Sequence, residues 1–131
     1  MDKQIVELRT LKVGRYIIID GSPCKIIGMT HSKPGKHGGA RSRVDAVGIF
    51  DGQKRNLMKP VSDKVDVPII EKKEAQVLNV VGGNVQLMDM TSYETLELPV
   101  PDEFKDKMDA GREVIYMEAM GQRAIIQIKE G

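Results

Sequence analysis

The segment from 31 to 43, HSKPGKHGGARSR, concentrates the residues of this chain that are best suited to contact phosphate. It holds both histidines, no acidic residue and four cations, which are Lys33, Lys36, Arg41 and Arg43. Lysine and arginine attract phosphates, and glycine lets a ligand approach the main chain closely. Pro34 restricts the backbone just before Gly35, and the glycines after Lys36 leave the following backbone less restricted. We therefore expect Lys36 to stand alone at a narrow tip.

Three other kinds of site fit this segment less well. A nucleotide-binding phosphate loop needs four residues between its first glycine and Gly-Lys, followed by Ser or Thr; here six residues separate Gly28 from Gly35-Lys36, and a histidine follows. Zinc would need the two histidines and Cys24, whose spacing matches no zinc pattern. A Schiff-base lysine needs a dry pocket, which an exposed tip does not offer. Nucleic-acid contact and an ordinary basic hairpin loop both remain open.

The first half of the chain is predicted to be a small β-barrel that carries this loop. An apolar run at 16–19 is followed by Asp20-Gly21 and a second run through 26–27, and Asp-Gly is typical of tight hairpins. Alternation at 44–49 ahead of Asp51-Gly52 predicts another hairpin. Residues 30–42 show no apolar periodicity, so we expect a long loop between the hairpins.

The second half is predicted to begin after Ile69 and to form an OB-fold. Strands are expected at 75–81, 85–90 and 93–98, then a short helix in PDEFKDKMDAG, then strands at 112–119 and 124–129. The helix is expected because acids open this segment, lysines follow and Gly111 comes after its end. Three strands, a helix and two strands is the order of the OB-fold, a barrel that often binds oligonucleotides.

Charge divides along the same boundary. The chain has 131 residues and a net charge of +1, but residues 1–69 carry 13 Lys and Arg against 7 Asp and Glu, whereas residues 70–131 carry 7 against 12. The halves are therefore +6 and −5, which favours an anion partner at the first half only. One cysteine permits no internal disulfide, and no apolar leader or long apolar run is present, so we expect a cytoplasmic protein without membrane contact.

The stretch SKPGKHGGARSRVDAVGIFDG, with PCK at 23–25 and GKHG at 35–38, resembles the translation initiation factor 5A family in its archaeal form, a relative of bacterial elongation factor P. The resemblance runs from Leu8 to Ile128. It implies an SH3-like barrel at 1–69 that carries a modification loop at 30–43, and an OB-fold domain at 70–131. Pro34 and Gly39 stand where eukaryotic members have Thr and His, and the acidic extension of those members is missing, which favours an archaeal type.

The resemblance also implies a modification of Lys36. In this family the matching lysine receives an aminobutyl group of spermidine from deoxyhypusine synthase, and in eukaryotes it is then hydroxylated to hypusine. Gly35, His37 and Gly38 match the flanks that the modifying enzyme must accommodate. No cofactor beyond this covalent group is implied, and Lys33, Arg41 and Arg43 are candidates for RNA phosphate contacts.

The function implied by the resemblance is a ribosome-binding translation factor that is not an enzyme. Its modified lysine would reach the acceptor end of peptidyl tRNA, promote peptide-bond formation at stalling sequences such as polyproline, and assist termination. The expected partners are ribosomal RNA, peptidyl tRNA and deoxyhypusine synthase, with no DNA. A general RNA-binding module that uses an unmodified basic loop is the alternative. Little RNA contact is expected from 70–131, which offers only Tyr93, Phe104 and Tyr116 as aromatic residues.

Overall fold

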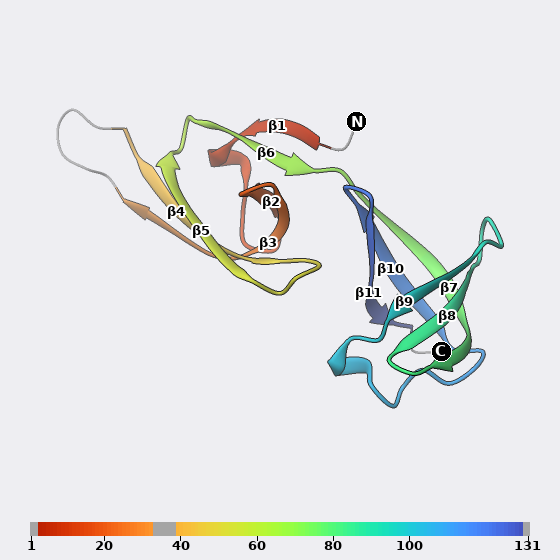
Figure 1. The fold of residues 1–131 in the computed structure, drawn as a ribbon. Coiled ribbons are helices and arrows are strands. Elements are labelled where there is room, and N and C mark those ends of the chain that lie inside the picture. The colour runs from red at the N-terminus through yellow and green to blue at the C-terminus, as the bar shows by residue number, and fades with distance from the viewer. Residues whose placement is uncertain (1–2, 33–38, 130–131) are drawn as a thin grey trace. The chain divides into compact units, whose positions relative to one another are not determined.

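The computed structural model describes residues 3–32 and 39–129, and nearly all of its regular structure is β-strand (Figure 1). The chain divides into two compact units, residues 1–69 and residues 70–131. The first unit contains β1 (Lys3–Glu7), η1 (Leu8–Thr10), β2 (Tyr16–Ile19), β3 (Ser22–Ser32), β4 (Arg41–Gly48), β5 (Lys54–Pro60) and β6 (Lys64–Pro68). The second contains β7 (Ile70–Val81), β8 (Asn84–Asp89), β9 (Thr95–Pro99), η2 (Asp102–Phe104), β10 (Glu113–Ala119) and β11 (Gln122–Ile128). The expected all-β fold class is confirmed.

The first unit is a curled antiparallel sheet with a two-stranded ribbon beside it. The sheet has the order β2-β3-β4-β5, and β1 pairs with β6, which also contacts β2. Alternate side chains of these strands point inward, as expected for a sheet with one buried face. The buried core consists of Leu8, Ile17, Ile19, Cys24, Ile26, Val44, Ala46 and Val65.

The two Asp-Gly pairs form different turns. Asp20 and Gly21 have φ values of +52° and +78°, which the tight hairpin between β2 and β3 requires, so that prediction is confirmed. Between β4 and β5 only Gly52 has positive φ, at +69°, and the connection spans residues 49–53. Asp51 instead accepts hydrogen bonds from the Gln53 N–H and from both Arg55 Nη atoms, which stabilises this longer connection.

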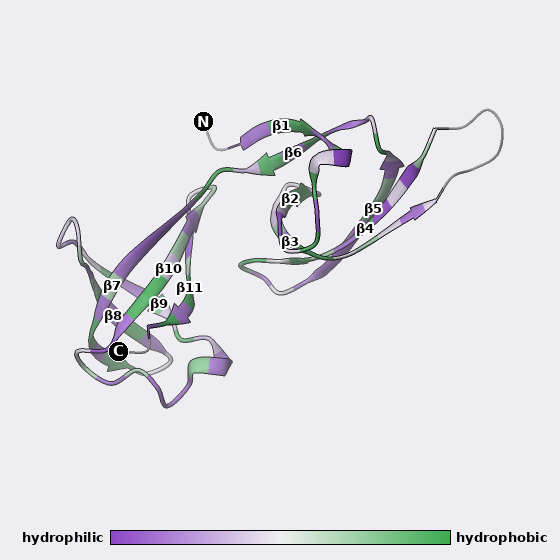
Figure 2. Ribbon diagram, turned by 180° about the vertical axis from the view of Figure 1, so that it is seen from behind, coloured by the Kyte–Doolittle hydropathy of each residue, from purple (hydrophilic) through white to green (hydrophobic). Residues whose placement is uncertain are grey.

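Strands β3 and β4 extend well into the segment that was expected to be loop. Thr30, His31 and Ser32 pair with Arg43, Ser42 and Arg41, so the loop prediction for 30–43 is wrong at both ends. Ladder hydrogen bonds come from the backbone and need no apolar side chains. The strand ends were therefore missed, because their side chains are polar and show no apolar alternation. Figure 2 shows the hydrophilic ends of both strands next to the grey trace.

The second unit has the sheet order β11-β10-β7-β8-β9, and β11 also approaches β9, which curls the sheet as in an OB-fold. The predicted short helix is present only as the single 3₁₀ turn η2. After this turn Asp106 adopts a φ of +72°, a conformation that an α-helix does not allow, and Met108 is buried in the core. The segment buries Met108 in the core instead of continuing as a solvated helix, which accounts for the difference between the predicted helix and the single turn.

A buried hydrogen bond joins two strands of the second unit. The Tyr116 hydroxyl of β10 donates to Asp89 Oδ2 at the end of β8 over 2.5 Å, and the other Asp89 oxygen accepts from the N–H groups of Thr91 and Ser92. The hydrogen bond from Tyr116, followed by that from Ser92, lowers the pKa of Asp89 from 3.8 to about 2. Burial, and then Asp89, raises the pKa of Tyr116.

We predict that Asp89→Asn makes the second unit less sensitive to acid. The folded pKa of Asp89 lies below its unfolded value, so its contribution of about 2 kcal/mol is complete above pH 4 and is lost as pH falls towards 2. At neutral pH the variant should lose about 1–3 kcal/mol of unfolding free energy. Urea titrations at several pH values, monitored by the amide resonances of β8 and β10, measure the unfolding of this unit separately from that of the other.

The matched control is Glu103→Gln, which removes an exposed carboxylate of the same unit. It should behave as wild type at every pH. Acid sensitivity of the Asp89→Asn variant equal to that of wild type would show that Asp89 has no such role.

Candidate functional site

The candidate site lies where β3 and β4 end. Five of the predicted site residues, Lys33, Gly35, Lys36, His37 and Gly38, lie outside the described residues. The described strands pair as far as Ser32 and Arg41, so the segment that carries Lys36 joins two neighbouring strand ends. Backbone pairing therefore fixes both points at which the chain leaves and re-enters the sheet.

Strand alternation places the two remaining predicted residues on one face and the nearby His31 on the other. Arg41 and Arg43 are two residues apart on β4, both exposed, and share the outward face with Thr30. His31 pairs with Ser42, whose position belongs to the opposite, partly buried face. The structure thus brings the two arginines together and separates His31 from them.

The two arginines differ in their partners. Arg43 Nε lies 3.3 Å from Asp45 Oδ1, and both side chains are about half exposed, so this ion pair is worth little and can be exchanged for a phosphate. Arg41 forms no ion pair with any residue among 3–32 and 39–129. Arg41 is the more available cation for an anionic partner.

Met58 is a neighbour of this face that sequence analysis missed. It pairs with Arg43 across β4 and β5, and it is 54% exposed. A flexible thioether beside two arginines adapts readily to uneven surfaces such as folded RNA. Strand alternation within 54–60 could have found it, because Leu57 takes the inward position.

The structure also tests two of the other site types considered from sequence. Cys24 and His31 are seven residues apart on one strand, roughly 20 Å, so they cannot share a metal ion. Gly28 lies in β3 at a register shift, and a carboxylate oxygen of Asp45 lies 3.8 Å from the position that a Cβ at Gly28 would take. A carboxylate at this position repels phosphate, so Gly28 is not part of a phosphate-binding loop.

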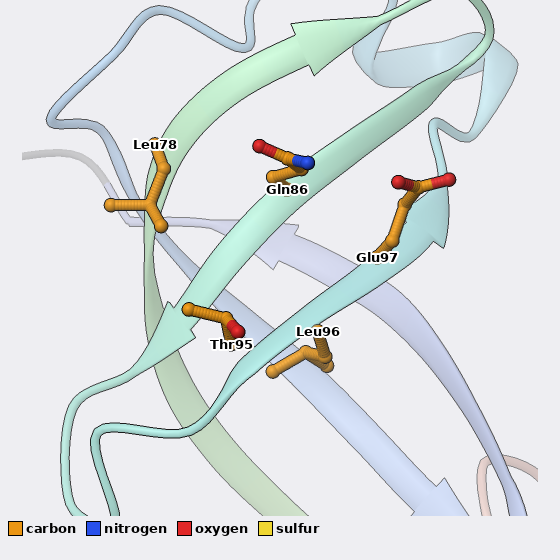
Figure 3. Close-up of a pocket in the computed structure, with 5 residues that line it drawn as sticks. All are labelled: Leu78, Gln86, Thr95, Leu96 and Glu97. Atoms are coloured by element: carbon orange, nitrogen blue, oxygen red, sulfur yellow. The ribbon is translucent and has the colours of Figure 1, made fainter.

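The second unit has a shallow pocket of about 280 Å³ on the face of β7, β8 and β9. Figure 3 shows Leu78 on β7, Gln86 on β8 and Glu97 on β9 around it. Within the described chain its lining includes neither an aromatic ring nor a cation. Stacking and phosphate contact, which bind single-stranded nucleic acid in OB-folds, are therefore not provided here.

The aromatic residues of this unit are likewise poorly placed for stacking on bases. Tyr116 is buried and bound to Asp89, and Phe104 is half-buried against the core. Tyr93 is 71% exposed, on the connection between β8 and β9. Of the three aromatic residues noted in the sequence, only Tyr93 is accessible to a partner.

No helix in residues 3–32 and 39–129 has the length and apolar character needed to span a membrane.

Two family models together match most of the chain. Residues 4–63 match the model described as "Translation initiation factor 5A-like, N-terminal". Residues 69–129 match the model described as "Eukaryotic elongation factor 5A hypusine, DNA-binding OB fold". The OB-fold seen in the second unit therefore agrees with the family that matches there.

Known relatives extend over both units. Translation initiation factor 5A of Methanothermobacter thermautotrophicus is 56% identical over 129 residues, which are 98% of this chain and 99% of that protein. The protein of the same name from Archaeoglobus fulgidus is 56% identical over 123 residues, or 94% of this chain and 96% of that protein.

Solved structures agree with these sequence relatives. Eukaryotic translation initiation factor 5A from Methanococcus jannaschii superposes with a TM-score of 0.92 at 47% identity, covering 98% of this chain and 96% of that chain. A translation initiation factor 5A family protein from Naegleria fowleri gives a TM-score of 0.77 at 31% identity, covering 99% and 100%. Because sequence and fold match these proteins along both units, the chain belongs to the translation initiation factor 5A family.

Proposed function

We propose that this protein is a ribosome-binding translation factor whose Lys36 carries an aminobutyl group and stabilises the acceptor end of peptidyl tRNA. In this role it promotes peptide-bond formation at stalling sequences such as polyproline and assists termination. The observation that carries the proposal is the family membership combined with the motif Gly35-Lys36-His37-Gly38 between two paired strand ends. The family that matches residues 69–129 is described as a hypusine-containing factor, which supports a modification of this kind somewhere in the protein.

The modified side chain suits a narrow, negatively charged space. Addition of an aminobutyl group to Lys36 Nζ roughly doubles the length of the side chain and adds a second amine. A thin dication can follow a sugar-phosphate backbone where the planar guanidinium of arginine is too wide. Phosphate contacts position a partner without reading its sequence, which suits a factor that must act on many different tRNAs.

The proposed contribution is orientation of a substrate for a reaction that ribosomal RNA catalyses. Holding the acceptor end of peptidyl tRNA in a reactive pose lowers the entropic part of the barrier. The protein would then need no catalytic residue and no cofactor beyond the spermidine-derived group. The ribosome and peptidyl tRNA are the proposed partners in a cytoplasmic setting, with deoxyhypusine synthase as the modifying enzyme.

The surrounding residues support contact with RNA on both sides of the modified lysine. Lys33 precedes it, and Arg41 and Arg43 follow it on the outward face of β4. A net charge of +6 in residues 1–69 adds a longer-range attraction for phosphate. The same arginines are what favour the alternative, a general RNA-binding module with an unmodified loop.

Intact mass distinguishes the two functions most directly. We predict that protein purified from its native host is heavier than the unmodified chain by one aminobutyl group, with or without one added oxygen. Fragmentation should place this mass on the peptide that contains Lys36. Protein made in a bacterium that lacks deoxyhypusine synthase is the matched control and should have the unmodified mass. Native protein with that same unmodified mass would favour the general RNA-binding module.

We predict that Lys36→Arg abolishes relief of polyproline stalling without loss of fold, because arginine cannot accept the aminobutyl group. Translation of a reporter with consecutive prolines, in a reconstituted system with modified wild-type protein as reference, measures this effect. Lys33→Arg in the same segment is the matched control and should retain activity. Equal stalling relief by the Lys36→Arg variant and wild type would contradict a role for the modification.

We predict that Arg41→Ser combined with Arg43→Ser lowers the salt dependence of ribosome binding. Each lost phosphate contact reduces the slope of log affinity against log salt by about 1, so the pair should reduce it by about 2. The matched control is Lys12→Ser combined with Arg15→Ser. These two residues flank Gly14, whose N–H donates to Ile26 O of β3. An unchanged slope in the arginine variant would show that this face does not contact RNA.

A further inference from the structure

The second unit carries a larger groove that the proposed function does not use. It has a volume of about 610 Å³ and lies between the turn that joins β7 to β8 and the connection from β9 to β10. Its apolar side is formed by Val80, Val100 and Met108. Val80 is 45% exposed, so part of this apolar surface faces solvent.

Backbone hydrogen bonds hold both sides of the groove in place. The Val100 N–H donates to Gly83 O over 3.0 Å, and the Gly111 N–H donates to Val77 O over 2.8 Å. These bonds tie the two ends of the β9–β10 connection to β7 and to the β7–β8 turn. The groove is therefore formed before any partner arrives, which lowers the entropic cost of binding.

A register shift in β7 changes which of its side chains are exposed near Val80. Val77 pairs with Leu87 and Asn79 pairs with Gln86, so Leu78 is an extra residue without a partner in the ladder. Beyond this bulge the chain no longer alternates between buried and exposed side chains, and Leu78, Val80 and Val81 are all at least 41% exposed. Of these three residues Val80 lines the groove, so its exposed apolar surface is available for a protein contact.

The polar side of the groove is acidic. Asp102, Asp106 and Asp109 line it against one cation, Lys105. The whole half from 70 to 131 has a net charge of −5, so the field around the groove is also negative. Such a surface repels the phosphates of a nucleic acid and attracts a partner with positive charge.

We propose that this groove binds a basic peptide segment of a partner protein, in which an apolar side chain lies between two lysine or arginine residues. The apolar side chain would pack against Val80 and Val100, and the flanking cations would lie over the aspartates. Complementary charge would speed association and select against acidic partners. This contact needs no modification of Lys36 and is independent of the function proposed above.

The test uses the full, unmodified chain labelled with ¹⁵N and the peptide Gly-Lys-Leu-Lys-Leu-Lys-Gly as probe. We expect saturable changes in the amide resonances of residues 80–83 and 100–109. A peptide with glutamate in place of each lysine should produce none. Resonance changes confined to other residues, or no changes with the lysine peptide, would overturn the proposal.

Two pairs of matched variants separate local contact from general attraction. Asp102→Lys combined with Asp109→Lys should weaken peptide binding by about tenfold or more, since two partly exposed ion pairs are replaced by repulsion. Glu103→Lys alters charge next to Asp102 but outside the groove lining. It should weaken peptide binding less than about a third as strongly as the double variant does. Val80→Ser should weaken binding several-fold, whereas Val81→Ser, which lies outside the lining, should not.

A single-stranded oligothymidylate is the competing probe, because the family model that matches this half is described as a DNA-binding OB fold. We expect it to leave residues 80–83 and 100–109 unaffected. Resonance changes there with the oligonucleotide, strengthened in the Asp102→Lys and Asp109→Lys variant, would assign the groove to nucleic acid and overturn the proposal.

Discussion

The arrangement of the candidate site depends on backbone pairing between β3 and β4. This pairing continues to Ser32 and Arg41, beyond the last buried side chains of either strand. Ladder hydrogen bonds join backbone N–H and C=O groups, which every residue type except proline carries in full, so the strand ends are free to carry arginine, serine and histidine. The same pairing places Arg41 and Arg43 on one face and gives the intervening segment two fixed ends.

The two units carry opposite charge, and each offers a different kind of surface. Residues 1–69 present arginines beside a thioether, a combination suited to phosphate and uneven RNA. Residues 70–131 present an acidic groove with an apolar side, a combination suited to basic protein segments. The two proposed contacts, one with RNA and one with protein, thus use separate surfaces and compete little with each other.

Turn chemistry and strand periodicity were enough to predict most of the fold. Asp20-Gly21 identified its hairpin because both residues tolerate positive φ, and the strand order of the second half identified the OB-fold. Two expectations failed where local pattern and tertiary structure disagree. The polar strand ends near Thr30 and Arg43 looked like loop, and the segment around Met108 looked like helix although the core binds its side chain.

The site itself was less accessible to sequence analysis than the fold. The cationic motif marked Lys36 directly, whereas the neighbouring Met58 depends on a cross-strand register that no local pattern specifies. The acidic groove is even harder to predict from the sequence, because it combines residues of β7, of the turn after it and of the β9–β10 connection. Only the three-dimensional arrangement brings Val80 beside Val100 and Met108.

The length of β3 has a mechanical consequence. From the core position Cys24 to Ser32 the strand covers eight steps, or about 26 Å. A rotation of only about 5° at the barrel would therefore displace the strand end by about 2 Å, several times the roughly 0.5 Å range of hydrogen-bond distances. Substitutions deep in the barrel, remote from any RNA, can thus alter where the cationic segment is delivered.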